Sequence, residues 1–395
     1  MPSTSPGQTL SRRLAACARL IRGDLFTAPT LATPNALPAL TTVRIFLALG
    51  VVLFHLQLTW AWPTAAYTGL LERARLGVDM FFILSGFVLA HVYTRQIETG
   101  SYSHRRFLIA RLARIYPAHL AILLLMVVIA GFAMGLGERF DPALYSPGGL
   151  LRTALLVHAW TPTNTPVEWN GPSWSLSAEW AAYLLFPVFA AIGVGLKARP
   201  LLLIAIAVLT FAVLDGLYRF VFNDALLHAE FNLGVMRIAP TFLGGMALQA
   251  CADRLSLRRV TAVAIALGAA SLLVGLMHAR ADERLVVAAA GGLILALALV
   301  SKAGADGPLA WPGLIFLGEA SYAIYLLHLP LLVLWKNARA LLVGGDSAYT
   351  MPMIEVLGFL ALTLAGGAIL HIGLERPVRD WVRRRFLPAT RVNAQ

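Results

Sequence analysis

The sequence predicts an all-α, polytopic integral membrane protein with about ten transmembrane helices and with both termini in the cytoplasm. Of its 395 residues, 58% are apolar and only 13% are charged, and the mean hydropathy is +0.73. A soluble chain of this length could not bury so much apolar surface. Basic residues fall in short clusters between long apolar runs, so the net charge of +12 indicates membrane topology and not a nucleic-acid partner.

The apolar runs set the positions of the helices. A bilayer core about 30 Å thick is crossed by about 20 apolar residues in a helix. Applied along the chain, this length predicts spans near residues 42–60, 76–94, 115–136, 174–195, 200–221, 231–251, 259–278, 285–301, 313–335 and 353–373. Pro187 and Pro240 interrupt the fourth and sixth spans, which a membrane bundle tolerates where neighbouring groups satisfy the freed carbonyls.

The basic residues predict the orientation. With the N-terminus inside, roughly two thirds of the 32 Lys and Arg residues fall in cytoplasmic segments. We therefore expect a basic cytoplasmic segment over residues 1–40, a ten-helix membrane domain over 41–375 and a basic cytoplasmic tail over 376–395. The Arg-rich stretch 10–26 favours an amphipathic helix on an anionic leaflet over a signal peptide, with an organellar transit peptide as a minor alternative.

Two further features limit the chemistry. The only cysteines, Cys17 and Cys251, lack metal-ligand spacing, so neither a disulfide framework nor a metal site is expected. The longest connection between spans, 137–173, is predicted to lie on the outer side and to form a structured lid.

Arg44 and His55 carry the first functional signal, because an ionisable side chain inside a membrane helix needs a partner, a wet cavity or a function. Eleven helical steps place two side chains within roughly 20° of one face and about 16 Å apart along the axis. One face of the first span would then hold a cation near the inner surface and an imidazole towards the outer side. A snorkelling arginine and a histidine satisfied by a neighbouring helix remain the alternative.

Four more ionisable residues are expected at a depth similar to that of His55, in the outer half of the bilayer. They are Asp79, Glu179, Arg237 and His328. An ion pair of Arg237 with either carboxylate would explain part of this cluster. The histidines are better explained by general-base chemistry, for which an imidazole beside a carboxylate is suited near neutral pH.

Basic residues also gather where the third span begins, namely Arg105, Arg106, Arg111 and Arg114. Arg111 and Arg114 are three residues apart and share a helix face. Cytoplasmic retention of positive charge explains such a cluster, and so does an anion site, because guanidinium groups match phosphate oxygens. Both interpretations remain open from the residues alone.

Several motifs in one order make the chain resemble the integral-membrane acyltransferase 3 family over about residues 38–386. The first is Arg44 with His55 in the first span, and the others are Gly77-Val-Asp-Met-Phe-Phe-Ile-Leu-Ser-Gly-Phe87, Arg111-Leu-Ala-Arg114-Ile-Tyr-Pro117, Trp174-Ser-Leu-Ser-Ala-Glu179, Ser321-Tyr-Ala-Ile-Tyr-Leu-Leu-His328 and Glu375-Arg-Pro377. Each motif alone is weak, whereas their joint order and spacing are specific. A fused periplasmic hydrolase-like domain with a Gly-Asp-Ser motif, which some members carry, is not expected, because the sequence stops soon after its tenth predicted span.

The resemblance implies a ten-helix enzyme of the bacterial inner membrane that takes an acyl group, usually acetyl, from cytoplasmic acyl-CoA and passes it to a hydroxyl on the outer side. Its motif gives the catalytic role to His55, with Arg44 as companion, and the CoA phosphates to the arginines that open the third span. We therefore expect acetyl-CoA to be bound by Arg44, Arg106, Arg111 and Arg114, with no metal. Glu179 or Asp79 would orient the imidazole, and Trp174, Arg237 and His328 would bind a saccharide or glycolipid acceptor. Ser85 and Gly86 are assigned to close helix packing.

Two other functions are compatible with the sequence. One is a transporter or flippase of a lipid-linked sugar, because broken helices and charges within the membrane also suit transport. The other is a non-catalytic partner in polysaccharide assembly. The transporter predicts that unmodified substrate accumulates across vesicles, and the non-catalytic partner predicts that His55 is dispensable.

Overall fold

The computed structural model describes residues 33–34, 36–60, 62, 64–135, 145–163, 169–343 and 350–387. Within these ranges the ordered elements are helices, and β pairing is limited to an isolated bridge between Trp60 and Met351. The amphipathic stretch expected at 10–26 and parts of the expected lid, 137–144 and 164–168, lie outside the described residues.

Eight helices of the described chain are long and apolar enough to cross a membrane. They are α2 (Pro38–Gln57), α4 (Gly77–Glu98), α5 (His104–Gly135), α9 (Pro200–Phe222), α11 (Arg259–His278), α12 (Glu283–Lys302), α13 (Pro312–Val343) and α14 (Met353–Leu370). Only 22% of the apolar window of α9 and 17% of that of α11 are buried, so most of their apolar side chains face outward, as lipid contact requires. The all-α polytopic membrane fold is confirmed.

A bent pair of helices makes up a ninth candidate crossing. α7 (Ser173–Leu184) and α8 (Phe186–Gly195) cover the fourth predicted span and meet at an angle of 64°. Pro187 is the second residue of α8, where its ring cannot continue the preceding helix but is compatible with starting a new one. The proline predicted to interrupt this span therefore divides it in two.

The sixth predicted span, 231–251, is shorter than expected. Gly234–Arg237 form a 3₁₀ turn, η4, and α10 (Ile238–Arg254) has 17 residues, fewer than the roughly 20 that cross a bilayer. Pro240 lies in its first turn, where an N–H group would have no helical partner. α10 packs between α4 and α9, so the bundle and not the lipid covers most of it.

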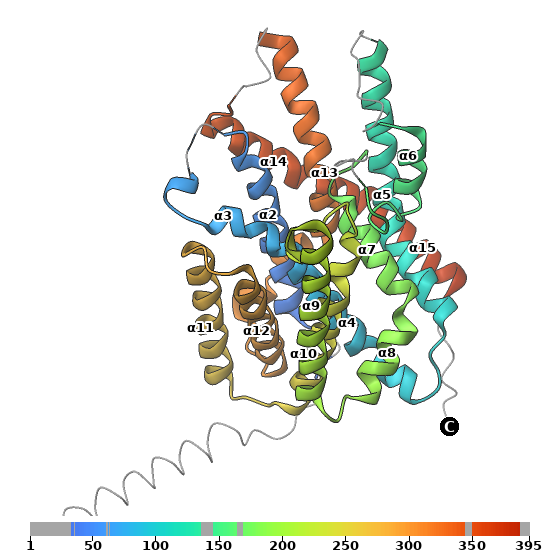
Figure 1. The fold of residues 1–395 in the computed structure, drawn as a ribbon, viewed down its shortest axis with the longest axis vertical. Helices are drawn as coiled ribbons and strands as arrows, with labels where there is room; N and C mark the ends of the chain where they lie inside the picture. Colours follow the sequence, from blue (N-terminus) through green and yellow to red (C-terminus); the bar gives the residue numbers. More distant parts are fainter. Residues whose placement is uncertain are drawn as a thin grey trace, which may run out of the picture.

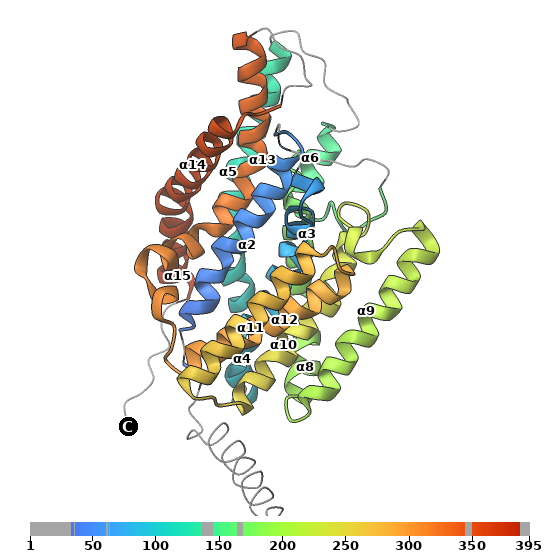
Figure 2. The same cartoon turned by 90° about the vertical axis from the view of Figure 1, so that its left-hand side faces the viewer.

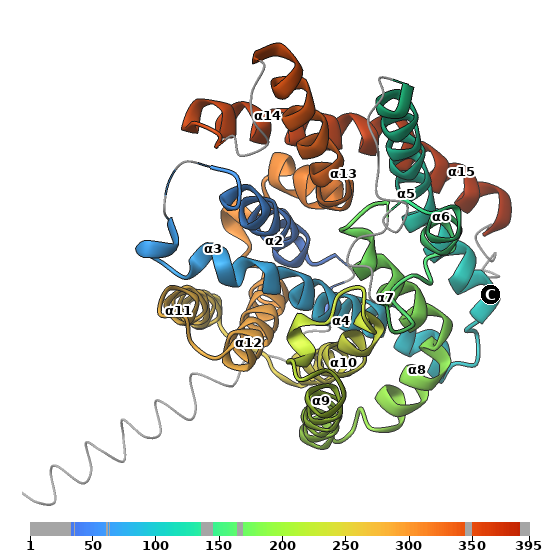
Figure 3. The ribbon, with the colours of Figure 1, turned by 45° about the horizontal axis from the view of Figure 1, so that its top comes forward.

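α2 and α4 occupy the middle of the bundle, and the other long helices surround them (Figure 3). Of the apolar window that includes α4, 67% is buried. Two glycines bring α4 and α10 into backbone contact, because a Cβ on Gly86 would lie 2.1 Å from the carbonyl oxygen of Phe242, and one on Gly245 would lie 2.0 Å from that of Ile83. The packing role expected for Gly86 agrees with this contact.

The long helices give the bundle two ends, called here the Arg44 end and the His55 end after their positions on α2. At the His55 end, α5 and α13 extend beyond the other helices (Figures 1 and 2). Towards the Arg44 end, α14 continues through a π-helical turn, η6 (His371–Glu375), into α15 (Arg376–Phe386), which packs along α5. α15 is thus a helix of the bundle surface that begins where the basic tail was predicted to begin.

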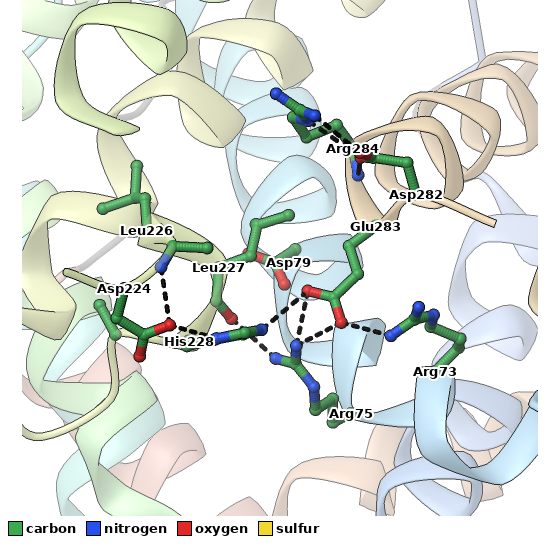
Figure 4. Close-up of polar contacts among 12 residues, drawn as sticks. Arg73, Arg75, Asp79, Asp224, Leu226, Leu227, His228, Asp282, Glu283 and Arg284 are labelled. Atoms are coloured by element: carbon green, nitrogen blue, oxygen red, sulfur yellow. Dashed lines mark hydrogen bonds and ion pairs between the residues drawn. The ribbon is translucent and has the colours of Figure 1, made fainter. Parts of the chain in front are cut away.

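Short elements at the His55 end are joined by a charge network around Glu283, the first residue of α12. Arg73 in α3 (Leu70–Arg73), Arg75 in η2 (Ala74–Leu76) and His228 in η3 (Leu226–His228) surround its carboxylate, at 2.5, 2.6 and 3.4 Å (Figure 4). Arg75 also donates to the carbonyl oxygen of Leu227 at 2.7 Å. The network holds the connection after α9 against the starts of α4 and α12.

Candidate functional site

A deep cavity of about 420 Å³ lies between α2, α4, α5, α7 and α13, on the Arg44 side of the bundle. Its wall includes Arg44, Arg111 and Arg114, the arginines that the sequence assigned to acyl-CoA, together with Glu179. The helix spacing that predicted a shared face for Arg111 and Arg114 therefore brings both side chains to one cavity, and α2 adds Arg44 to it.

A second cavity of about 600 Å³, called here the mouth, shares these three arginines and lies further towards the Arg44 end. Arg106 lines only the mouth, as do Arg379 and Arg383 from α15. Sequence reasoning missed the last two, since it treated the basic tail as a topological signal. Their spacing of four residues, which puts them on one face of a helix, was the signal that could have identified them.

The three shared arginines differ in their protein partners. Arg114 forms an ion pair with Glu375, which is fully buried and also accepts from His371 Nδ1 at 2.9 Å. Arg44 makes no hydrogen bond or ion pair with any described residue, and the guanidinium of Arg111 contacts the rings of Phe107 and Tyr183, each at 5.9 Å. The buried Nε of Arg111 has no hydrogen-bond partner. An anion from outside the chain would complete this set.

Glu179 belongs to the deep cavity and not to the histidine pair. Its Oε1 accepts hydrogen bonds from Ser85 Oγ at 2.5 Å and Tyr183 Oη at 2.6 Å. Two hydroxyl donors on one oxygen hold the carboxylate in a fixed orientation. The Ser85 hydroxyl thus donates to a carboxylate, a neighbour that the sequence did not indicate.

Arg237 pairs with Asp79, which resolves the two partners that the sequence left open. Asp79 is fully buried and receives Nε of Arg237 at 3.2 Å and Nη2 at 2.6 Å, while Nη1 donates to the carbonyl oxygen of Ala229 at 3.0 Å. The ring of Trp174, itself 4% exposed, lies 4.8 Å from the guanidinium carbon. The three residues form one buried unit that joins α4, η4 and α7.

The structure brings His328 of α13 to His55 of α2. Nε2 of His328 lies 3.2 Å from Nδ1 of His55, and the ring centroids are 4.9 Å apart. Nδ1 of His328 faces the carbonyl oxygen of Tyr325, and Nδ1 of His55 lies 2.9 Å from that of Val51. Among the described residues, no hydrogen bond or ion pair connects His55 with Asp79 or Glu179.

These contacts assign the tautomers of the two neutral rings. A carbonyl oxygen only accepts, so Nδ1 of each ring carries the proton, and Nε2 of His328 is an acceptor. Nδ1–H of His55 can therefore be shared between Val51 and His328. What remains is an unprotonated Nε2 on His55, the atom that a general base needs.

The deep cavity ends at Tyr325 and Ser175, one helical turn from His328 along α13. The two hydroxyls lie 3.0 Å apart, and both contact the carbonyl oxygen of Pro172, from Tyr325 at 3.1 Å and from Ser175 at 3.0 Å. The ring of Tyr325 lies 5.8 Å from that of His328. Tyr325 thus stands between the arginine-lined cavity and the histidine pair.

A second polar group lies under the segment expected to form a lid, of which 145–163 and 169–173 are described. His119, Thr153, His158 and Asn170 are at most 2% exposed, and each has a side-chain atom without a hydrogen-bond partner. Nε2 of His119 bonds the carbonyl oxygen of Thr153 at 3.0 Å, and Nε2 of His158 lies 3.2 Å from Ser173 Oγ. Buried atoms of this kind are normally completed by ordered water or by ligand hydroxyls.

Among the residues that the structure describes, no three His, Cys, Asp or Glu side chains form a group that could hold a metal ion.

Comparison with known proteins identifies a family that matches this chain. Residues 37–372 match a family model described as an acyltransferase domain. The chain is 32% identical over 384 residues to the acyltransferase MdmB of Streptomyces mycarofaciens, a match that covers 90% of this chain and 94% of that protein. No solved structure matches it significantly.

More distant relatives match only part of their own length. A Staphylococcus aureus (strain COL) protein whose name marks it as a candidate O-acetyltransferase is 26% identical over 368 residues, covering 87% of this chain and 57% of that protein. Protein 2 of the picA locus of Rhizobium radiobacter is 35% identical over 112 residues, 27% of this chain and 59% of that protein.

Proposed function

Since the chain belongs to the acyltransferase family whose domain spans residues 37–372, we propose that this membrane acyltransferase uses acyl-CoA, normally acetyl-CoA, and passes the acyl group to a hydroxyl of a saccharide or glycolipid. The carrying observation is that one helix, α2, bears both Arg44 in the arginine-lined cavities and His55 in the histidine pair. An anionic donor and a base are then held at a fixed separation of about 16 Å along that helix.

Acyl-CoA as the donor is supported by the charge and shape of the cavities. The deep cavity and the mouth share three arginines that come from two helices. Guanidinium groups bind pyrophosphate oxygens in pairs, and the deep cavity, which is lined by both these arginines and Tyr325, would take the narrow pantetheine arm. The thioester would arrive at the ring of Tyr325, which must turn aside for it to reach His55.

His55 acts as the general base in this proposal. Its Nε2 takes the proton of the acceptor hydroxyl while the hydroxyl oxygen attacks the thioester carbonyl carbon. The tetrahedral intermediate collapses with cleavage of the C–S bond, and the CoA thiolate takes up the proton from the imidazolium. The products are the ester and CoA, with no net proton released.

His328 has a positioning role that differs from the acceptor contact first assigned to it. It is 1% exposed and faces His55 and a backbone carbonyl, so it holds the His55 ring in place and adds a second acceptor for Nδ1–H beside the carbonyl oxygen of Val51. Glu179 and the pair Asp79–Arg237 hold the surrounding helices. The ring of Trp174 packs against the guanidinium of Arg237.

The acceptor class rests on the buried polar group at the His55 end. Unpartnered nitrogen and oxygen atoms of His119, Thr153, His158 and Asn170 suit a polyhydroxylated ligand or the waters that it would displace. The excess of Lys and Arg at the Arg44 end supports a cytoplasmic location for that end, and acceptor modification would then take place on the outer face of a bacterial inner membrane.

The test is release of CoA from acetyl-CoA by protein in lipid nanodiscs, with a panel of polysaccharide and glycolipid acceptors and with mass spectrometry of the acceptor. Wild-type protein should acylate at least one acceptor, and His55→Ala should lose at least about 100-fold in rate. His278→Ala, an exposed histidine at the same end, serves as the matched control. Full activity of His55→Ala would remove the proposed base, and accumulation of unmodified acceptor inside sealed proteoliposomes would favour a transporter.

A further inference from the structure

The mouth is lined by more arginines than the deep cavity. Its lining includes six arginines, from α2, α5 and α15, and a single acidic side chain, Glu319. Three of them, Arg44, Arg111 and Arg114, also line the deep cavity, whereas Arg106, Arg379 and Arg383 line the mouth alone. The arginines therefore form two tiers at different distances from His55.

The geometry points to the outer tier, Arg379 and Arg383 of α15 with Arg106 of α5, as the binding site for the 3′-phosphate of the CoA donor, and this inference rests on the proposed function. CoA carries phosphate at two places: a pyrophosphate next to the pantetheine arm, and a monoester on the ribose, further from the thiol. With the thiol directed towards His55, the pyrophosphate falls at the tier of Arg44, Arg111 and Arg114. The monoester then falls at the tier of Arg106, Arg379 and Arg383.

The folding of α15 explains why these two arginines face the mouth. Val378, Val382 and Phe386 lie at intervals of four residues and line an apolar groove with α5. Packing that stripe turns the adjacent face of the helix, which carries Arg379 and Arg383, towards the mouth. Arg384 and Arg385 line neither cavity and are exposed.

The hydrogen-bonding state of the outer tier also favours an anion. Nε of Arg379 is buried without a hydrogen-bond partner, and its nearest carboxylate, Oδ1 of Asp380, is 3.6 Å away, beyond hydrogen-bond length. Arg383 makes no side-chain hydrogen bond or ion pair with any described residue. A phosphate monoester, with a charge of about −1.5 to −2 at neutral pH, would accept from both guanidinium groups.

The inference makes α15 a specificity element. A donor that lacks the 3′-phosphate, such as dephospho-CoA, or one whose pantetheine is attached to a carrier protein, would keep the contacts in the deep cavity and lose those of the outer tier. Only CoA itself would engage both tiers.

Binding of CoA and of 3′-dephospho-CoA to the full-length protein in nanodiscs tests this without an acceptor. Isothermal titration should give wild-type protein a dissociation constant roughly tenfold or more lower for CoA than for dephospho-CoA. In Arg379→Ala/Arg383→Ala that ratio should fall to about one, with little change in the affinity for dephospho-CoA. Arg384→Ala/Arg385→Ala, with the same loss of charge on the same helix, should keep the wild-type ratio.

The outcomes separate the two proposals. Equal affinities of the wild-type protein for both ligands, or an unchanged ratio in Arg379→Ala/Arg383→Ala, would overturn the 3′-phosphate site and leave the CoA donor in place. Failure of wild-type protein to bind either ligand would remove the CoA donor as well. A parallel loss of affinity in the control variant would show that general positive charge, and not the outer tier, attracts the ligand.

Discussion

His328 on α13 holds its Nε2 atom 3.2 Å from Nδ1 of His55 on α2, although 273 residues separate them in the sequence. The contact is directional, because the Nδ1 proton of His328 is committed to the carbonyl oxygen of Tyr325 and its Nε2 can only accept. The Nδ1 proton of His55 therefore has an acceptor on each helix, the carbonyl oxygen of Val51 on α2 and Nε2 of His328 on α13.

His328→Gln and His328→Leu should separate positioning from packing. A glutamine can still present an oxygen to Nδ1–H of His55, whereas leucine cannot, so kcat should fall roughly 10- to 100-fold in His328→Leu and much less in His328→Gln, with KM for the donor unchanged. Steady-state kinetics of both variants supply the comparison. Equal kcat values for the two variants would assign the effect to packing alone.

Arg44→Met should weaken CoA binding without destabilising the fold. Arg44 lines both cavities and has no hydrogen bond or ion pair with a described residue, so its removal breaks no direct polar contact and takes away only its longer-range attraction to Glu179 and Glu375. We expect a loss of roughly tenfold or more in CoA affinity with a Tm near that of the wild type. Unchanged affinity in titration with CoA would exclude Arg44 from the donor site.

Arg114→Ala should behave differently from Arg44→Met. Removing Arg114 leaves Glu375, which is fully buried, without its cation, and breaking a buried pair costs about 3–5 kcal/mol. Arg114→Met/Glu375→Gln should recover most of the lost Tm while CoA affinity stays low. Thermal unfolding followed by tryptophan fluorescence gives the Tm, and titration with CoA gives the affinity. If the double variant recovered both its Tm and its CoA affinity, Arg114 would have no role in binding the donor.

Asp79→Ala should be a folding defect. Its two oxygens take two donors of Arg237, and α4, η4 and α7 meet at this pair, so the variant should lose about 3–5 kcal/mol of stability. Asp79→Asn keeps a side-chain oxygen that can accept from Arg237, so the stability of this variant should lie between those of the wild type and Asp79→Ala. The Tm values of the wild type and the two variants in nanodiscs test this order of stabilities. A stable Asp79→Ala protein with a large loss of kcat would instead indicate that Asp79 takes part in catalysis.

Gly245→Ala should prevent α4 and α10 from packing, whereas Gly244→Ala should not. A Cβ at Gly245 would meet the Ile83 carbonyl oxygen at 2.0 Å, but one at Gly244 would meet nothing within 4 Å. Overpacking costs about 1–3 kcal/mol and more where backbone must move. The yield of folded protein after size-exclusion chromatography should fall only for Gly245→Ala, and equal yields would contradict the close contact.

Asp282 provides a pH-dependent contribution to stability. It precedes α12, accepts from the backbone N–H of Arg284 at 2.9 Å, and its carboxylate is held by the Arg284 guanidinium, which lowers its pKa from 3.8 to about 2 (Figure 4). A lowered folded-state pKa adds stability above pH 3.8 that is lost as the pH falls towards 2. The Tm difference between wild type and Asp282→Asn should therefore be small and should shrink between pH 5 and roughly pH 3, since Asp282 is largely exposed. A difference that grows on acidification would have the wrong sign.

Much of the fold followed from hydropathy, because lipid leaves the backbone no alternative to the helix. The differences arise at helix ends. α5 begins at His104 and not near 115, since basic residues continue a helix as readily as apolar ones, and α13 runs on to Val343 past its predicted end at 335. α10 begins late because Gly234–Arg237 adopt a tighter turn.

The candidate site was predictable where one helix carried two of its residues. Arg44 and His55 on α2, and Arg111 and Arg114 on α5, lie as their spacing indicated. Contacts between helices were not predictable, because depth in the membrane does not determine which helices are neighbours. The sequence thus missed the contact of His328 with His55, left open whether Asp79 or Glu179 pairs with Arg237, and gave no sign that Glu375 faces Arg114.

Tyr325 gives the arginine-lined cavity a closed end, with its hydroxyl on Pro172 and Ser175. For ions crossing the bilayer, this wall of hydrogen-bonded protein atoms is a barrier on the route between the arginine-lined cavity and the histidine pair. A membrane that contains the protein would keep its electrical resistance at this point, while a polar cavity still reaches into the bundle on the Arg44 side.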